Sequence, residues 1–286
     1  MRGVNLSRQT SQKFAFAVLT VLAVVVVVPI VLVVAYIVVQ GIGAISWEFL
    51  TTFPSNGMKE GGILPALVGT VVLTFATAIA SIPISVGAAV YLAEYARDTW
   101  LTRGIRLAII NLAGIPSVVY GLFGLGLFVL FLGLGTSIVA GGLTLGLMTM
   151  PVVISTAEEA LLAVPQRFRV VSRSLGAGHW QTVRQVVLPN ALPGILTGII
   201  LGLERAAGET APILFTVAAF YLPQLPLSPM DQTMALPYHL YVISTQVPGM
   251  PLDVQYGVAL VLLALVLGMN LVATIIRSRF RRRREW

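Results

Sequence analysis

The chain alternates between long apolar runs and shorter polar segments. Six of the apolar runs are long enough to cross a bilayer of about 30 Å as helices, which takes about 20 residues. They cover residues 15–39, 66–93, 107–131, 138–163, 191–220 and 256–276. We therefore predict an all-α polytopic membrane protein with six transmembrane helices. Residues 1–14 form a tail, and residues 15–286 form a single transmembrane domain that ends in a basic tail at 277–286.

The distribution of charge orients this arrangement. Hydrophobic residues make up 57% of the chain and charged residues 10%, and the mean hydropathy is +0.92, which is typical of a membrane protein. All Lys and Arg residues except Lys59 and Arg205 lie in the tails and loops that six spans place on one side. The positive-inside rule makes that side, with both termini, cytoplasmic, so the net charge of +7 does not indicate a nucleic-acid partner. A signal peptide at residues 15–39 is disfavoured because the apolar core is too long.

Two polar segments are predicted on the opposite side. Residues 40–65 are expected to form an ordered loop, and residues 221–255 to contain a short helix at 234–244 lying on the outer surface. Within the spans, Pro83, Pro116 and Pro151 favour kinks. Glycines in the third span allow close helix contacts, at positions 114, 121, 124 and 126. Helices with such kinks and glycines can line and gate a transport path, and they are equally common in ordinary helix packing within membranes.

The fifth span carries Glu204, Arg205 and Glu209, which are costly to place in a membrane and therefore indicate a functional site. Arg205 and Glu209 are four residues apart and can form an ion pair on one helix face. Gly208 and Pro212 predict a break just after the charges. A guanidinium suits oxyanions, although two ionised glutamates would leave the site at minus one. The alternative is an ion pair that only fixes packing. Further donors are expected from Ser117 and Tyr120, and also from Asn111 and Thr149.

The polar segment 165–190 predicts a surface for another protein. Projected as a helix, Arg167–Leu175 places Phe168, Val171 and Leu175 on one side, with Arg169 and Arg173 flanking. Gly176 ends this helix, and a second helix over residues 179–188 is expected to stop at Pro189. The alternative is a helix on the membrane surface. The chain has no P-loop and no cysteine, and its two histidines are far apart, so we predict neither ATP hydrolysis nor a metal site in this chain.

Several motifs carry a resemblance to a known family. Gly176 followed by Leu188 and Pro189 resembles the EAA loop of type I ATP-binding-cassette importer permeases, although Val170 replaces the usual glutamate. The segments GIPSVVYGLFG (114–124), MPVVISTAEEA (150–160), LPNALPGILTG (188–198) and RAAGETAP (205–212) are similar to the A-type permease family of high-affinity phosphate importers. The resemblance implies the type I (MetI-like) permease fold and phosphate translocation at Arg205 and Glu209, and Glu204 departs from the expected small residue.

The resemblance also implies a set of partners in a bacterial inner membrane. These are a homologous second permease, two ATPase subunits that carry ATP and magnesium, and an external phosphate-binding protein, so this chain needs no cofactor of its own. The surface for the ATPase is expected to include Arg167, Phe168, Arg169, Val171, Leu175, Gly176, Leu188 and Pro189. Two alternatives stay open, namely sulfate or molybdate as cargo, and a secondary transporter in which Glu204 or Glu209 relays protons.

Overall fold

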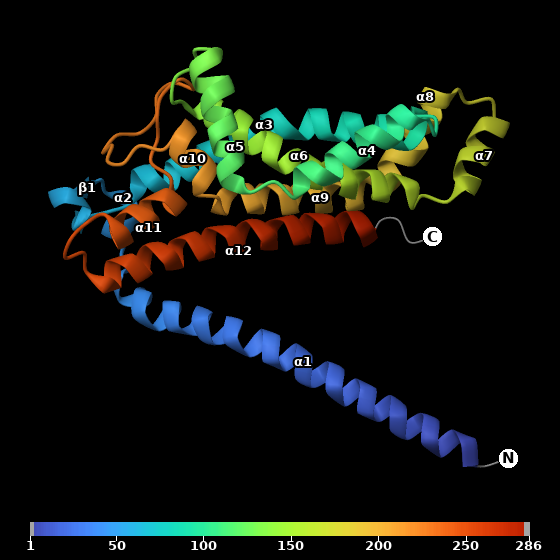
Figure 1. The fold of residues 1–286 in the computed structure, drawn as a ribbon, viewed down its shortest axis with the longest axis horizontal. Helices are drawn as coiled ribbons and strands as arrows, with labels where there is room; N and C mark the ends of the chain where they lie inside the picture. Colours follow the sequence, from blue (N-terminus) through green and yellow to red (C-terminus); the bar gives the residue numbers. More distant parts are fainter. Residues whose placement is uncertain (1–2, 283–286) are drawn as a thin grey trace.

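The computed structural model describes residues 3–282 and is built almost entirely from helices (Figure 1). The long helices are α1 (Gly3–Gly41), α3 (Leu64–Val90), α6 (Ile138–Leu162), α9 (Leu188–Gly208) and α12 (Leu252–Arg282). Within the described residues, five helical stretches are long and apolar enough to cross a membrane, and α4 (Trp100–Ala113) with α5 (Ser117–Gly124) gives a sixth if this bent pair counts as one span. Arg2 and residues 283–286 of the predicted tails lie outside the described residues.

The predicted span over residues 107–131 is wrong as a single helix. α4 ends at Ala113, and α5 with the π-helical stretch η4 (Leu125–Phe131) leaves it at an angle of 104°. Pro116 lies at the start of α5 with an extended ψ of 140°. Since α4 has 14 residues, it reaches about 21 Å, less than a hydrocarbon core of about 30 Å. After the bend, α5 runs across the direction of the long helices (Figure 1).

The fifth span begins earlier than predicted. α8 (His179–Thr182) and the π-helical turn η5 (Val183–Val187) run directly into α9 without a stop at Pro189. Proline has no N–H to give to the helix ladder. The preceding N–H, of Leu188, bonds to the carbonyl of Val183 in a π-type turn, and the proline then lies in the first turn of α9, where a missing N–H costs little. The predicted stop is thus wrong.

The predicted break after the charges is confirmed. α9 ends at Gly208, Glu209 takes an extended conformation (φ −76°, ψ 134°), and α10 (Ala211–Thr216) follows as a separate short helix. Arg205 consequently lies in the last turn of α9 rather than in the middle of a helix. Of the glycines in the third span, Gly121 and Gly124 make the predicted close contacts, against α10 and α6, whereas Gly126 has open space beside it.

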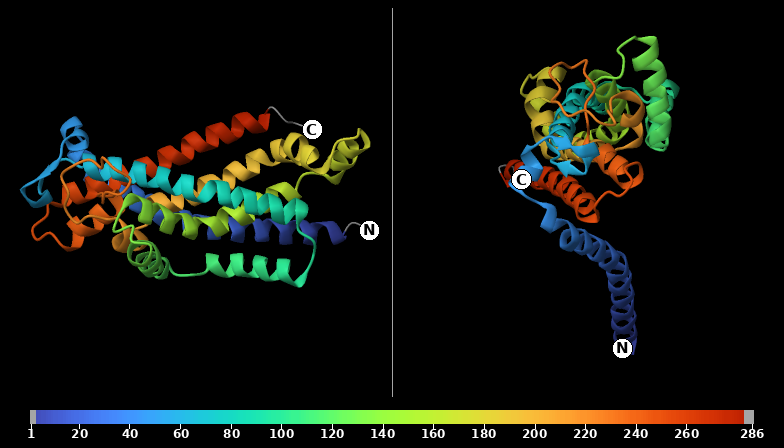
Figure 2. Two further views of the ribbon diagram at one scale, coloured as in Figure 1. Left: turned by 90° about the horizontal axis from the view of Figure 1, so that it is seen from above. Right: turned by 90° about the vertical axis from the view of Figure 1, so that its left-hand side faces the viewer.

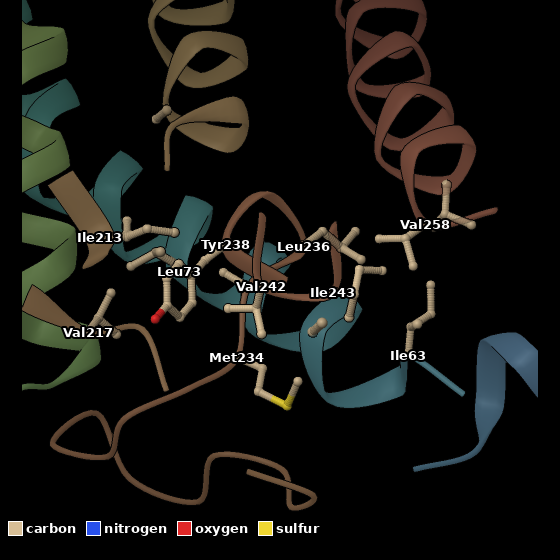
Figure 3. Close-up of a cluster of buried hydrophobic side chains, with 14 of the residues drawn as sticks. Ile63, Leu73, Ile213, Val217, Met234, Leu236, Tyr238, Val242, Ile243 and Val258 are labelled. Atoms are coloured by element: carbon tan, nitrogen blue, oxygen red, sulfur yellow. The ribbon is translucent and has the colours of Figure 1, made fainter. Parts of the chain in front are cut away.

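A buried apolar core closes one end of the bundle, here called the α11 end. α11 (Leu236–Thr245) contributes Leu236, Val242 and Ile243, which pack against α3, α10 and α12 (Figure 3). The predicted short helix therefore exists at the surface of this end, with its apolar face buried in the core and Tyr241 exposed. The predicted ordered loop at 40–65 is confirmed and contains η1 (Ile42–Ala44), α2 (Trp47–Thr51), η2 (Asn56–Met58) and a two-stranded antiparallel sheet of β1 (Pro54–Ser55) and β2 (Glu60–Gly61).

The opposite end carries α7 (Gln166–Ser174) and α8 and is here called the α7 end. The first residues of α1 and the last of α12 lie at this same end (Figure 2), as an even number of crossings requires. α1 leaves the bundle as it approaches this end (Figure 1) and its apolar side chains are exposed all round. It is held chiefly at its other end by α12, where Tyr36 and Tyr256 meet edge to face at 5.5 Å.

Candidate functional site

The charged site is built at the broken end of α9. Arg205 Nε donates to Glu209 Oε1 at 3.4 Å, so the predicted i,i+4 ion pair forms. The contact is long, and the Arg205 side chain is 40% exposed while that of Glu209 is 17% exposed. Within residues 3–282, no further hydrogen bond is made by the terminal nitrogens of the guanidinium. A planar pair of donors is therefore available to an oxyanion.

Glu204 is separated from this pair. It is adjacent to Arg205 in sequence and so points about 100° away around the helix. Its Oε2 accepts a hydrogen bond from Asn270 Nδ2 of α12 at 3.1 Å, and its Oε1 is buried with no partner among the described residues. The negative charge that would oppose an anion thus lies on the α12 side of α9. Without Glu204, the ion pair of Arg205 and Glu209 has a net charge close to zero.

Two of the other predicted donors, Tyr120 and Thr149, are engaged elsewhere. Tyr120 is buried, and its hydroxyl donates to the carbonyl of Leu112 at 2.8 Å, which braces the bend between α4 and α5. Thr149 is buried and donates to Gly146. Ser117 lies on the first turn of α5, which packs against α10 next to the break. No hydrogen bond joins Ser117 or Tyr120 to Arg205 or Glu209 within the described part of the chain, so their contact with cargo stays a prediction.

Glu209 borders a very small cavity towards the α11 end. The cavity measures about 10 Å³ and is lined by Thr70 and Thr74 of α3, by α9 and α10, and by Pro237 of α11. Such a volume holds at most about one water molecule. The space beside Glu209 is therefore too small for a phosphate-sized ion in this conformation, and Pro237 of α11 borders it.

The second candidate surface is a groove at the α7 end. It has a volume of about 580 Å³ and lies between α7 and α8. Five of the predicted coupling residues line it, together with polar side chains of α8 and η5: Arg167, Phe168, Val171, Leu175 and Gly176. Gly176 has φ +87°, which a residue with a side chain rarely adopts, and this ends α7 as predicted. Val171 and Leu175 are exposed and apolar. The groove offers what a protein partner needs, an apolar floor with a polar rim.

Three predicted coupling residues lie elsewhere. Leu188 and Pro189 belong to the first turn of α9, and Leu188 packs against a buried cluster between α3, α6 and α9. Arg169 is buried rather than flanking an exposed face, because it forms an ion pair with Glu94 at 2.5 Å. A buried guanidinium is stable only when its donors are satisfied. The helical projection, which placed Arg169 at the edge of the exposed face, is therefore wrong for this residue.

The sequence analysis missed Glu94 and Asn270. Both are polar groups at or within apolar runs, which is a signal in itself because such groups need partners in a membrane. Their partners are remote in sequence. Asn270 meets Glu204 across 66 positions, and Glu94 meets Arg169 across 75. Helical spacing within one segment could not show either pairing.

Sequence comparison places these features in a family. Residues 81–286 match the family model described as "Binding-protein-dependent transport system inner membrane component". The probable ABC transporter permease protein YqgI of Bacillus subtilis is 34% identical over 94% of this chain and 95% of its own length. The phosphate transport system permease protein PstA 1 of Mycobacterium tuberculosis is 37% identical over 79% of this chain and 72% of its own length. A probable PstA of Methanocaldococcus jannaschii is 31% identical over 90% and 89%.

Solved structures confirm the fold. A chain of the MetNI methionine ABC transporter in an inward-facing conformation superposes with a TM-score of 0.61 at 20% identity, covering 76% of this chain and 95% of that chain. A chain of a bacterial ABC transporter involved in the import of alginate gives a TM-score of 0.64 at 13% identity, covering 96% and 99%. The predicted type I permease fold is therefore correct, and at these identities the likeness concerns the fold alone.

Proposed function

Because this chain belongs to the family of binding-protein-dependent transport system inner membrane components, and is thus the permease subunit of an ABC importer, we propose that its cargo is inorganic phosphate. Relatives named as phosphate transport permeases are 31–37% identical over most of the chain. The observation that carries the proposal is Arg205. Its guanidinium is partly exposed at the break in α9, and among residues 3–282 only its Nε has a hydrogen-bond partner, Glu209 at 3.4 Å.

The chemistry of that site favours a tetrahedral oxyanion. Guanidinium donors match two oxygens of such an ion, and the charge persists at any biological pH. Glu209 keeps the site neutral while it is empty, so the charge is not left exposed in the membrane. An arriving anion can accept hydrogen bonds from the two terminal nitrogens, and it displaces the carboxylate from Nε only across a long contact of 3.4 Å. Additional positive charge would come from a second permease subunit facing the same break.

We place the α7 end in the cytoplasm, since the basic residues gather there. The groove between α7 and α8 then receives an ATPase subunit, and each of the two permeases binds one copy. The α11 end faces an external phosphate-binding protein. Hydrolysis of ATP belongs to the ATPase subunits, whereas this chain supplies the membrane path and is itself non-enzymatic. Binding energy at the groove moves the helices between outward-facing and inward-facing states.

The test is uptake of labelled phosphate by the complete complex reconstituted in proteoliposomes with ATP inside. We expect uptake that needs ATP and the binding protein and that survives an excess of sulfate or molybdate. Uptake that is abolished by excess sulfate, with sulfate itself transported, would make this a permease for another oxyanion. Uptake that follows a proton gradient without ATP would contradict the role as an ATP-driven importer.

A further inference from the structure

The tip of α3 at the α7 end is held by contacts from three other segments. This tip is the π-helical turn η3 (Tyr91–Tyr95), which continues α3 and closes with a bond from the Ala96 N–H to the Tyr91 carbonyl at 2.8 Å. Arg106 of α4 donates to the Leu92 carbonyl at 3.0 Å. Arg169 of α7 pairs with Glu94. π-Helical turns inside helices occur frequently at functional sites.

The contact from α7 is the most buried of these. The side chains of Arg169 and Glu94 are 7% and 4% exposed. Arg169 Nε reaches both Glu94 oxygens at 3.2 and 3.3 Å, and Nη2 reaches Oε1 at 2.5 Å. The same guanidinium donates to the carbonyls of Val164 and Leu161, at 2.6 and 2.9 Å. With nearly all its donors used in one geometry, this side chain cannot pivot without losing charged hydrogen bonds in a buried place.

The third contact on the tip of α3 comes from α8. The Arg173 guanidinium, which can only donate, lies 2.8 Å from His179 Nδ1, so Nδ1 accepts. His179 Nε2 then carries the proton and donates to the Glu94 carbonyl at 3.0 Å. Glu94 is thus held through its side chain by α7 and through its backbone by α8. The two helices that form the exposed groove are fastened to the same residue of α3.

α3 leads from this tip to the closure at the opposite end. It packs along α6 and α9, and its 27 residues extend over about 40 Å. At its far end Thr70 Oγ1 accepts a hydrogen bond from the Leu236 N–H of α11 at 2.8 Å. One continuous helix thus connects η3 to the segment that closes the α11 end.

We propose that the buried pair of Arg169 and Glu94 is the positioning contact that passes movement of the α7–α8 groove to α3, and so couples ATP hydrolysis to opening at the α11 end. This rests on the proposed function, because the groove must hold the ATPase. The pair stays closed throughout the cycle and acts as a rigid link. Each of its residues is a positioning residue, since neither contacts cargo.

The test compares Glu94→Gln with Asp98→Asn in the reconstituted complex. Asp98 is a matched control, because it also pairs with an arginine, Arg103 at 2.7 Å, but both of those side chains are 68% exposed. The readout is the number of ATP molecules hydrolysed per labelled anion transported, measured on complexes with the full subunit content. Glu94→Gln should raise this ratio several-fold, because ATP is then hydrolysed without the movement of α3 that transport needs. Asp98→Asn should leave it unchanged.

A ratio for Glu94→Gln equal to that of the wild type overturns the proposal. If Glu94→Gln fails to assemble, a cysteine pair decides the matter, since the natural sequence contains no cysteine. Glu94→Cys with Arg169→Cys, joined by a reversible bis-methanethiosulfonate cross-linker, should transport more anion per ATP than the same protein after reduction. Equal transport before and after reduction, or a block by the cross-link, contradicts a rigid link. A wild-type complex that moves an anion other than phosphate would refute the proposed cargo, and the ratio is then measured with that anion.

Discussion

Glu209→Gln tests the balance of charge at the break in α9. In this structure Glu209 is the partner of Arg205, so an anion that binds the guanidinium must compete with this carboxylate. Glutamine keeps the size of the side chain and removes its charge. The local charge then rises by one, and the variant should bind phosphate more tightly and release it more slowly.

The size of the effect follows from the geometry. Two unit charges at the 3.4 Å that separates Arg205 Nε from Glu209 Oε1 attract by about 5 kcal/mol at an effective dielectric constant of about 20. Because the Arg205 side chain is 40% exposed, solvent screening reduces this to about 1 kcal/mol. A gain of about 1 kcal/mol corresponds to about fivefold in affinity.

Binding of labelled phosphate to the purified complex without the external binding protein measures this affinity directly. Glu204→Gln is the matched control, since that carboxylate faces Asn270 on α12 and should change the affinity by less than about twofold. Uptake by Glu209→Gln should fall, because release becomes slow. Weaker binding in Glu209→Gln, or equal effects of the two substitutions, would refute the reasoning.

Three further substitutions test other parts of the structure. Leu175→Asp places a charge in the groove at the α7 end and should abolish co-purification with the ATPase. Ser174→Asp, which lies outside the groove, should not. Equal recovery of the ATPase with both variants would contradict the docking role. Gly69→Ala sets a β-carbon 1.9 Å from the carbonyl oxygen of Met234, just before α11. It should lower the stability of the folded protein by about 1–3 kcal/mol, measured as thermal unfolding in detergent. Gly87→Ala on the same helix has open space and should be tolerated. Burial lowers the pKa of His239 in α11 from 6.5 to about 4. Below pH 6.5 the unfolded state therefore binds more protons than the folded state. The free energy of unfolding should fall by about 2 kcal/mol between pH 6.5 and 5. His239→Leu should flatten that loss, and an unchanged pH profile would contradict it.

The sequence predicts those features of the fold that depend on local chemistry. The break after Gly208 follows from a glycine and a proline four residues apart, and the ion pair of Arg205 and Glu209 follows from helical spacing. The kink at Pro116 is also predicted, but its angle of 104° and its direction could not be predicted in this way. A proline only permits a bend, and the direction is set by α5 packing on α10 through Gly121, far away in sequence.

In the candidate site, too, features that depend on neighbouring residues could be predicted, and features that depend on remote partners could not. Helical projection correctly places Val171 and Leu175 in the groove, because a repeat of four residues is a local property. It wrongly exposes Arg169, because the burial of a charge depends on a partner, and Glu94 comes from another span. The helix α11 shows the same limit. Its apolar positions show that one face packs, but only the structure shows that this face meets α3, α10 and α12.

The central claim is that the Arg205 guanidinium holds the anion during its passage. The most direct test is labelled phosphate uptake by the reconstituted complex with Arg205→Ala, alongside the yield of co-purified subunits. The account predicts that all subunits assemble and that uptake is lost. Assembly with uptake equal to that of the wild type would contradict it and would reduce the charged break in α9 to a packing device.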